Sequence, residues 1–364
     1  MKNAIAQEIQ AEVQLTLPER IGRILERNRS VETIVNILRE GGFSKSIPGS
    51  VPHEVKVMGI ATAIRSIPAF SGVLYGITCL AILNRVSGKT VLSNEHMSRV
   101  ETGDCDFLGL DDRLKWKAYI NLYSLLIEIL KRPEDSWPEV IFIDIPLFLT
   151  RSQMLQRLED CDELQHEWEE MEHFIRSFWD SEGRKLYPFN PSGPKLVSVM
   201  PRVNGTLFRG LRESGSTILV DDLDNRAIQM ISNEDTKLKQ AGSGKIIERL
   251  LRPQERTIGF SLSSVLTDAR TQPTRIFERG VCSYLMRASS RTRVWMIEVV
   301  GGLEDWRENR LDTLGSLLVN TCLFNNEDAL PLPLFTARKN VIFPKNVLEY
   351  MKQVVLESFK GVNR

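Results

Sequence analysis

Apolar and polar residues follow patterns along this chain that predict both helices and strands. Residues 110–132 carry apolar side chains at helical spacing, with acids near the start and bases at the end, which suits the helix dipole. Residues 55–85 are rich in β-branched and small residues and predict two or three strands. Residues 140–149 (VIFIDIPLFL) form an apolar run interrupted by one acid. Further helices are expected at 1–45 (two or three short ones), 151–179, 236–250, around 310–324 and 344–360. Further strands are expected at 195–203 and 293–301, with a short apolar stretch at 217–224. Residues 329–335 are expected to form a proline-rich connection.

The order of these elements predicts an α/β fold. Strands mix with long helices, and a helix separates the strands of 55–85 from the strand at 140–149. A strand that is apolar on both faces is typical of the interior of a sheet that helices cover on both sides. We therefore expect a mixed β-sheet flanked by helices, with residues 140–149 inside it.

Composition narrows the class of protein. The 364 residues include 47 basic and 47 acidic ones, so the net charge is zero and broad electrostatic binding of nucleic acid is disfavoured. The five cysteines are far apart and include no CxxC pair, which predicts reduced thiols rather than disulfides or a zinc site. We expect a cytoplasmic protein, because there is neither a signal peptide nor an apolar run of the roughly 20 residues that span a membrane.

Two acids within apolar strands are the main candidates for chemistry. Asp144 lies within VIFIDIPLFL and Glu298 within RVWMIEVV. A buried ionised carboxylate is costly unless it is paired, hydrogen-bonded or bound to a metal. Nucleases that use Mg²⁺ or Mn²⁺ gather such carboxylates from neighbouring strands. The alternative is that backbone groups or arginines satisfy each acid.

Other familiar motifs are absent or incomplete. The AGSGK stretch at 241–245 lacks the first glycine and the final Ser or Thr of a phosphate-binding loop. His166 and His173 are seven residues apart, whereas two zinc ligands on one helix are usually three or four apart. There is no recognisable serine or cysteine triad.

Four segments, taken in order, resemble the NurA nuclease family, whose members work beside the hexameric ATPase HerA in processing DNA ends. They are GIATAIRSIPAFSGVLYGITCLAI, then LKWKAYINLYSLLIEIL followed by VIFIDIPLFL, then VWMIEVV, and last ALPLPLFTARKN before a terminal helix. The resemblance covers roughly residues 50–360. It implies an RNase H-like mixed β-sheet flanked by helices over residues 51–364, an N-terminal helical segment over residues 1–50, and a dimer that sits on a HerA ring.

The resemblance also implies a catalytic set of five residues, of which this chain keeps one. The second aspartate of the set is Asp144. The first aspartate would fall at Ile64 or Arg65, the tyrosine at Leu330 and the histidine at Arg338. The glutamate would fall within residues 117–121, none of which is acidic.

These observations leave three hypotheses. The first is a catalytically degenerate NurA-like homodimer that partners a HerA-like ATPase in DNA repair or antiphage defence, with Leu15, Leu17, Ile21 and Ile24 as candidate docking residues. The second is an active DNA nuclease that binds Mn²⁺ or Mg²⁺ at Asp144 and also uses Glu128, Glu298 and Asp222. The third is a non-enzymatic α/β scaffold protein.

Basic residues give candidates for contact with the DNA backbone, which is independent of sequence and weakens with salt. Three of them, Arg65, Arg338 and Lys339, are alternatively expected to pair with Asp144. The full set comprises Arg65, Arg202, Arg209, Arg212, Arg291, Arg293, Arg338 and Lys339.

Overall fold

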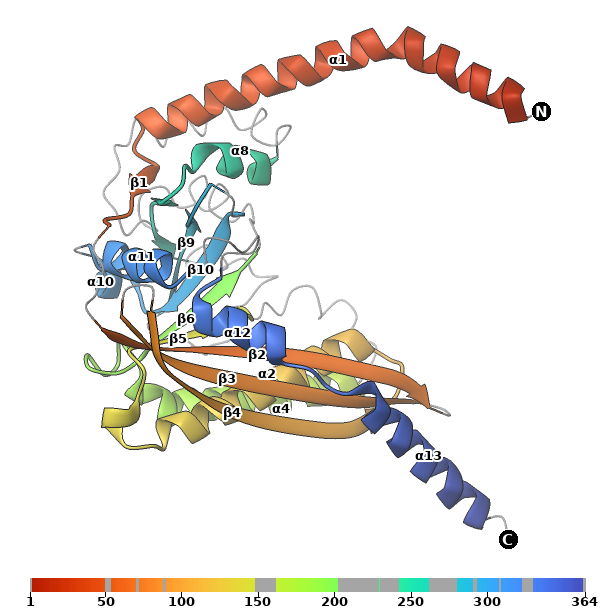
Figure 1. The fold of residues 1–364 in the computed structure, drawn as a ribbon, viewed down its shortest axis with the longest axis vertical. Coiled ribbons are helices and arrows are strands. Elements are labelled where there is room, and N and C mark those ends of the chain that lie inside the picture. Colours follow the sequence, from red (N-terminus) through yellow and green to blue (C-terminus); the bar gives the residue numbers. More distant parts are fainter. Residues whose placement is uncertain are drawn as a thin grey trace.

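A mixed β-sheet runs through the centre of the molecule (Figure 1). The computed structural model describes residues 2–49, 54–69, 72–87, 90–147, 162–201, 229, 242–261, 280–290, 293–307, 309–322 and 330–362. Its strands are β1 (Ser44–Ser46), β2 (Val55–Ala69), β3 (Gly72–Ser87), β4 (Thr90–Cys105), β5 (Val140–Ile143), β6 (Lys195–Met200), β7 (Glu255–Thr257), β8 (Phe260–Ser261), β9 (Val281–Arg287) and β10 (Trp295–Val300). The ten-stranded sheet has the order β1-β7-β9-β10-β6-β5-β2-β3-β4, with β8 beside β9. The α/β fold and mixed sheet expected from the sequence are confirmed.

The central strand β5 pairs in parallel with β2 on one side and β6 on the other. The remaining pairs are antiparallel, including the long hairpin of β2 and β3. All four residues of β5 are buried, as its apolar sequence predicts. The expectation that residues 55–85 and 140–149 contain adjacent strands is therefore confirmed, but the second strand is shorter than predicted: it ends at Ile143, so Asp144 lies just after it rather than inside it.

Helices cover both faces of the sheet. Ile141 and Ile143 of β5 pack on one face against α2 (Leu110–Leu130) and α4 (Asp162–Asp180). Val140 and Phe142 pack on the opposite face, against α10 (Leu303–Trp306), α11 (Arg310–Thr321) and α12 (Leu332–Asn340). The other helical elements are α1 (Lys2–Glu40), α8 (Ser243–Leu250), α13 (Lys345–Val362), η1 (Glu134–Ser136) and η2 (Glu182–Lys185).

The N-terminal helix α1 differs from the expected two or three short helices. It is continuous from residue 2 to residue 40 and projects from the body of the molecule in Figure 1. Its final turns pack into the core through Val31, Ile34 and Leu38, and Gly42 then reverses the chain with a φ of 78°. Gly22 meets no other side chain, and an exposed helical glycine costs only about 1 kcal/mol, so it does not end the helix.

Two further elements depart from the sequence-based expectation. The edge strand β4 was not predicted, because nearly all of its residues are exposed and its polar sequence shows no alternation. The helix α12 begins at Leu332, where the sequence predicts a connection. Pro331 and Pro333 flank its first residue, and proline is compatible with the first turn of a helix. The expected stretches at 151–161 and 217–224 lie outside the described residues.

Within the described part of the chain, none of the helices combines the length and apolar character that crossing a membrane requires.

Candidate functional site

Asp144 directly follows β5, at the end of a central parallel strand. Ile143, the last residue of that strand, is paired with Ile60 of β2 and Ser198 of β6. The carboxyl ends of parallel strands are the usual place for ligand sites in α/β sheets. The Asp144 side chain is only 11% exposed there.

Helix α12 brings a cation to this carboxylate. Arg338 Nε lies 3.7 Å from Asp144 Oδ2. The close approach of α12 depends on Gly59 of β2, because a Cβ at that position would lie 2.1 Å from the backbone nitrogen of Leu334. The position to which the NurA resemblance assigns a histidine therefore lies beside Asp144. The position assigned to the tyrosine, Leu330, is buried in the core.

Burial dominates the electrostatics of Asp144. It raises the pKa of the carboxyl group to about 6, although the nearby Arg338 guanidinium favours the ionised form. The second oxygen, Oδ1, is buried and has no hydrogen-bond partner among the described residues. Asp144 is thus partly compensated by Arg338 and by the backbone N–H groups of Asp144 and Thr62.

Glu298 faces the opposite side of the sheet. In the sheet register it lies beside Ser198, which in turn lies beside Ile143, so these three side chains share the face covered by α2 and α4. Its carboxylate accepts a hydrogen bond of 2.9 Å from the backbone N–H of Leu147. Burial raises the pKa of Glu298 to about 7. Glu298 therefore agrees with the alternative expected from the sequence, in which a backbone group rather than a metal hydrogen-bonds the buried acid.

Glu128 also lies apart from Asp144. It is on α2, on the opposite face from α12, with a side chain that is 45% exposed. Its carboxylate pairs with Arg99 of β4 at 2.8 Å. The structure therefore does not bring together the three acids that the active-nuclease hypothesis combines. Asp222 lies outside the described residues.

The described residues do not fit a divalent metal at Asp144. No group of three or more His, Cys, Asp or Glu side chains that could hold a metal ion occurs among them. Two-metal chemistry needs several carboxylates to neutralise the ions, whereas the neighbour of Asp144 is a guanidinium. The Arg338 guanidinium therefore already provides positive charge beside Asp144, where a metal ion would have to bind.

The candidate DNA-contacting residues that the structure describes lie on different elements. Arg65 lies on the distal half of β2, Arg293 before β10 and Lys339 in the last turn of α12, and all three are exposed. Four further candidates, Arg202, Arg209, Arg212 and Arg291, lie outside the described residues. Of the three bases expected near Asp144, Arg338 is the one that forms an ion pair with it.

Sequence reasoning missed Gly59, which positions this site. Its importance comes from the crossing of α12 over β2, a contact between residues far apart in the chain. A glycine within a predicted strand is a recognised signal of close backbone approach, but it does not identify the partner.

A mixed sheet flanked by helices, with an aspartate directly after a central parallel strand, defines a protein of the α/β class. The structure is similar to the NurA nuclease from Sulfolobus solfataricus, with a TM-score of 0.52 and 12% sequence identity, over 94% of this chain and 97% of that one. At this identity the similarity shows the fold, and it confirms at that level the resemblance seen in the sequence.

Two other solved structures have the same general similarity at lower scores. NurA bound to dAMP and manganese matches 94% of this chain and 95% of its own, with 12% identity and a TM-score of 0.43. The catalytic domain of human endonuclease V matches 92% and 98%, with 13% identity and a TM-score of 0.35. No family model matches the sequence. No curated protein matches it either.

Proposed function

We propose that this chain is a NurA-like DNA-processing protein whose metal site has degenerated and which acts as a subunit beside a HerA-type ATPase. The observation that carries the proposal is the ion pair between Asp144 and Arg338, within a fold similar to NurA over nearly the whole chain. The fold supports the class of protein, and the ion pair supports the loss of metal-dependent cleavage.

The guanidinium of Arg338 takes over part of the role that a metal would have. It supplies positive charge to a largely buried carboxylate that otherwise receives, among the described residues, only backbone hydrogen bonds, from Asp144 and Thr62. It cannot activate water or polarise a phosphate as a Lewis acid. Arg338 therefore stabilises the fold around Asp144 without supplying the chemistry of cleavage.

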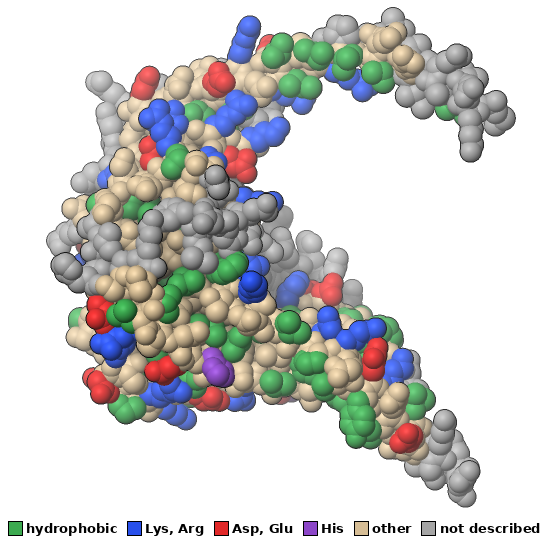
Figure 2. All heavy atoms as spheres, in the orientation of Figure 1, with side chains coloured by type: hydrophobic (Ala, Val, Ile, Leu, Met, Phe, Trp, Pro, Cys, Tyr) green, Lys and Arg blue, Asp and Glu red, His purple; other side chains and the backbone are tan. Residues whose placement is uncertain are grey.

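The exposed part of α1 is the surface that we assign to the ATPase. Leu17, Ile21 and Ile24 are 46%, 45% and 55% exposed, and the side chain of Leu15 lies outside what the structure describes. Figure 2 shows hydrophobic side chains in a row along α1, with basic side chains beside them. A contiguous exposed apolar surface is typical of a protein–protein interface. We also propose that the protein is a homodimer and that its exposed arginines contact the DNA backbone.

A cleavage and co-purification experiment tests this proposal. Linear double- and single-stranded DNA are incubated with Mn²⁺ or Mg²⁺ and with wild type, Asp144→Ala or the control Glu128→Gln, with and without a HerA-like ATPase encoded nearby. We expect no cleavage by any of the three proteins, and we expect the ATPase to co-purify with wild type but not with Ile21→Asp.

Two results would overturn the proposal. Cleavage by wild type and Glu128→Gln that is lost in Asp144→Ala would establish an active nuclease with a metal site at Asp144. Absence of both cleavage and co-purification would favour the scaffold hypothesis.

A further inference from the structure

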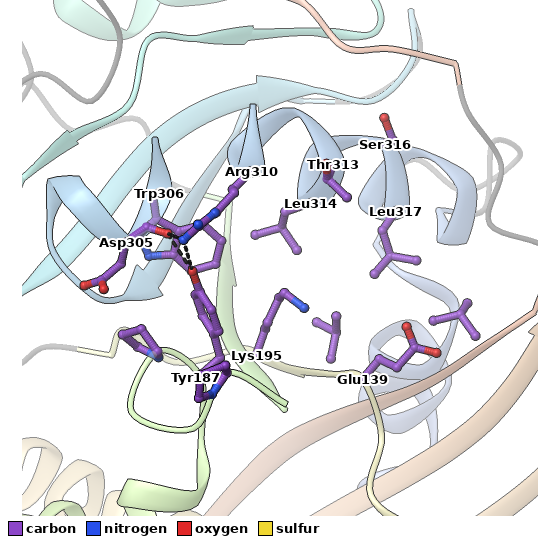
Figure 3. A pocket seen from close by; sticks show the side chains of 14 residues that line it. Glu139, Tyr187, Lys195, Asp305, Trp306, Arg310, Thr313, Leu314, Ser316 and Leu317 are labelled. Atoms are coloured by element: carbon purple, nitrogen blue, oxygen red, sulfur yellow. Dashed lines mark hydrogen bonds between the residues drawn. The ribbon is translucent and has the colours of Figure 1, made fainter. Parts of the chain in front are cut away.

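A cavity of about 670 Å³ lies at the opposite end of β5 from Asp144 (Figure 3). Its walls come from the starts of β5 and β6, from the turn after Tyr187, and from α10 and α11. The volume is within the range of small-molecule sites, about 300–1,000 Å³. The cavity shares no residue with the surroundings of Asp144 described above.

A partly buried lysine is the main polar feature of this cavity. Backbone hydrogen bonds fix the position of Lys195 in the chain. The Lys195 N–H donates to Glu139 O at 2.9 Å, and the Tyr187 N–H donates to the carbonyl oxygen of the preceding residue, Pro194, at 3.0 Å. Its ammonium nitrogen lies 5.6 Å from the centre of the Tyr187 ring. Within the described residues this cation has no hydrogen bond or ion pair, and burial lowers its pKa.

The other charged groups around the cavity favour a ligand with a single negative charge. Arg310 donates from one Nη to Tyr187 Oη at 2.9 Å and to Asp305 O at 3.0 Å. The Asp305 carboxylate accepts from Gly302 N at 2.8 Å, whereas Glu139 lies beside the lysine and opposes a strongly negative head group. A carboxylate therefore suits the site better than a phosphate dianion.

The apolar walls favour an aliphatic body over an aromatic one. Val140 and Leu314 are almost completely buried under the cavity, and Leu317 lies beside them. The two aromatic rings at the cavity, those of Tyr187 and Trp306, already make other contacts. Tyr187 has Lys195 near one face and packs against Trp306 at 5.2 Å and 72°, and the Trp306 N–H donates to Val300 O. A nucleobase would find no free ring on which to stack.

We infer that this cavity binds a small aliphatic carboxylate, with its head group at Lys195 and its chain against Leu314 and Leu317. In Figure 3 the Lys195 side chain extends toward the middle of the cavity, whereas the Arg310 guanidinium points toward Tyr187 and Asp305, to which it donates hydrogen bonds. The ion pair with the ligand would be partly desolvated, which strengthens it relative to one at an exposed lysine. The site is independent of the proposed DNA-processing function.

The test is calorimetric titration of the full-length protein with octanoate. Octylamine, adenosine monophosphate and a short peptide ending in leucine are titrated in parallel. The variants are Lys195→Met, which keeps most of the apolar stem, Thr313→Phe, which fills the cavity, and the control Lys115→Met on the exposed face of α2. Thr313 is suitable because the hydrogen bond that its hydroxyl donates within the described residues goes to Asn309 O, directly before its own helix, at 3.2 Å.

We expect octanoate to bind wild type and Lys115→Met equally, and to bind Lys195→Met and Thr313→Phe at least about tenfold more weakly. Octylamine and adenosine monophosphate should bind more weakly than octanoate. The inference is wrong if wild type does not bind octanoate, if both cavity variants bind it as tightly as wild type, or if the nucleotide binds more tightly. Tighter binding of the peptide would overturn it in favour of a protein partner's C-terminus. Because Asp144 is unchanged throughout, none of these outcomes bears on nuclease activity.

Discussion

Replacing Glu298 by glutamine tests whether this acid is structural or a metal ligand. Glu298 is buried on the α2 face of the sheet and accepts one backbone hydrogen bond from Leu147. Glutamine keeps the shape and can keep that hydrogen bond through its carbonyl oxygen, but it cannot ionise. The substitution therefore removes the cost of protonating this carboxyl group, which folding requires at pH values above its ordinary pKa.

The size of the effect follows from the pKa of Glu298. Its ordinary value is 4.5, and burial raises it to about 7. Between these two values the folded protein keeps a proton that the unfolded chain has released, so stability falls as the pH rises through this window. At about 1.4 kcal/mol for each pH unit, wild type loses about 3 kcal/mol between pH 4.5 and pH 7 through this one group. Glu298→Gln does not have this loss.

Urea denaturation at several pH values between 4.5 and 8 measures the effect. We expect the unfolding free energy of Glu298→Gln, minus that of wild type, to rise by about 3 kcal/mol across the range. Any constant cost of the buried amide cancels in this comparison. The control Glu128→Gln, at an exposed ion pair, should give a difference that hardly depends on pH. A flat or falling difference for Glu298→Gln would refute the reasoning, because it would mean that Glu298 is ionised and paired in the folded protein.

Three further predictions concern Asp144, the approach of α12 and the packing of α4. Arg338→Met should destabilise the protein by about 1 kcal/mol more at pH 8 than at pH 5, because Asp144 has a pKa of about 6 and is ionised only at the higher pH; chemical denaturation at both values measures this. Gly59→Ala should lower stability by at least about 2 kcal/mol in a thermal melt, because the added methyl group overlaps the backbone of α12. Arg113→Met should cost about 2 kcal/mol in urea denaturation, because it leaves Glu167, bound at 2.5 and 2.9 Å, without its partner.

Elements with a strong apolar pattern could be predicted from the sequence, and elements defined by tertiary contacts could not. The helix at 110–132 and the strands of 55–85 show clear periodicity, and the structure contains them as α2, β2 and β3. Strand β4 has a polar sequence and depends on its pairing with β3, which propensity does not reveal. The length of α1 was not predicted because an exposed residue of low helix propensity destabilises a helix by less free energy than the packing of the helix end contributes.

The candidate site was predictable to the level of one residue. Asp144 is conspicuous because an acid in a fully apolar strand requires compensation. That the compensation comes from Arg338, rather than Arg65 or Lys339, depends on how α12 crosses β2, and this depends on Gly59. The spacing of residues in the sequence contains no information on that crossing.

The register of the sheet explains why the two embedded acids have different roles. Glu298, Ser198 and Ile143 lie in one row across three strands, and Asp144 is the next residue after Ile143. Successive residues of a strand point to opposite faces, and the contact of Asp144 with α12 agrees with this rule. Two acids on different strands of one sheet can share a metal only if the register places both on the same face. In this protein the row that contains Glu298 ends at Ile143 rather than at Asp144, so Glu298 accepts a hydrogen bond from a backbone N–H and Asp144 pairs with an arginine.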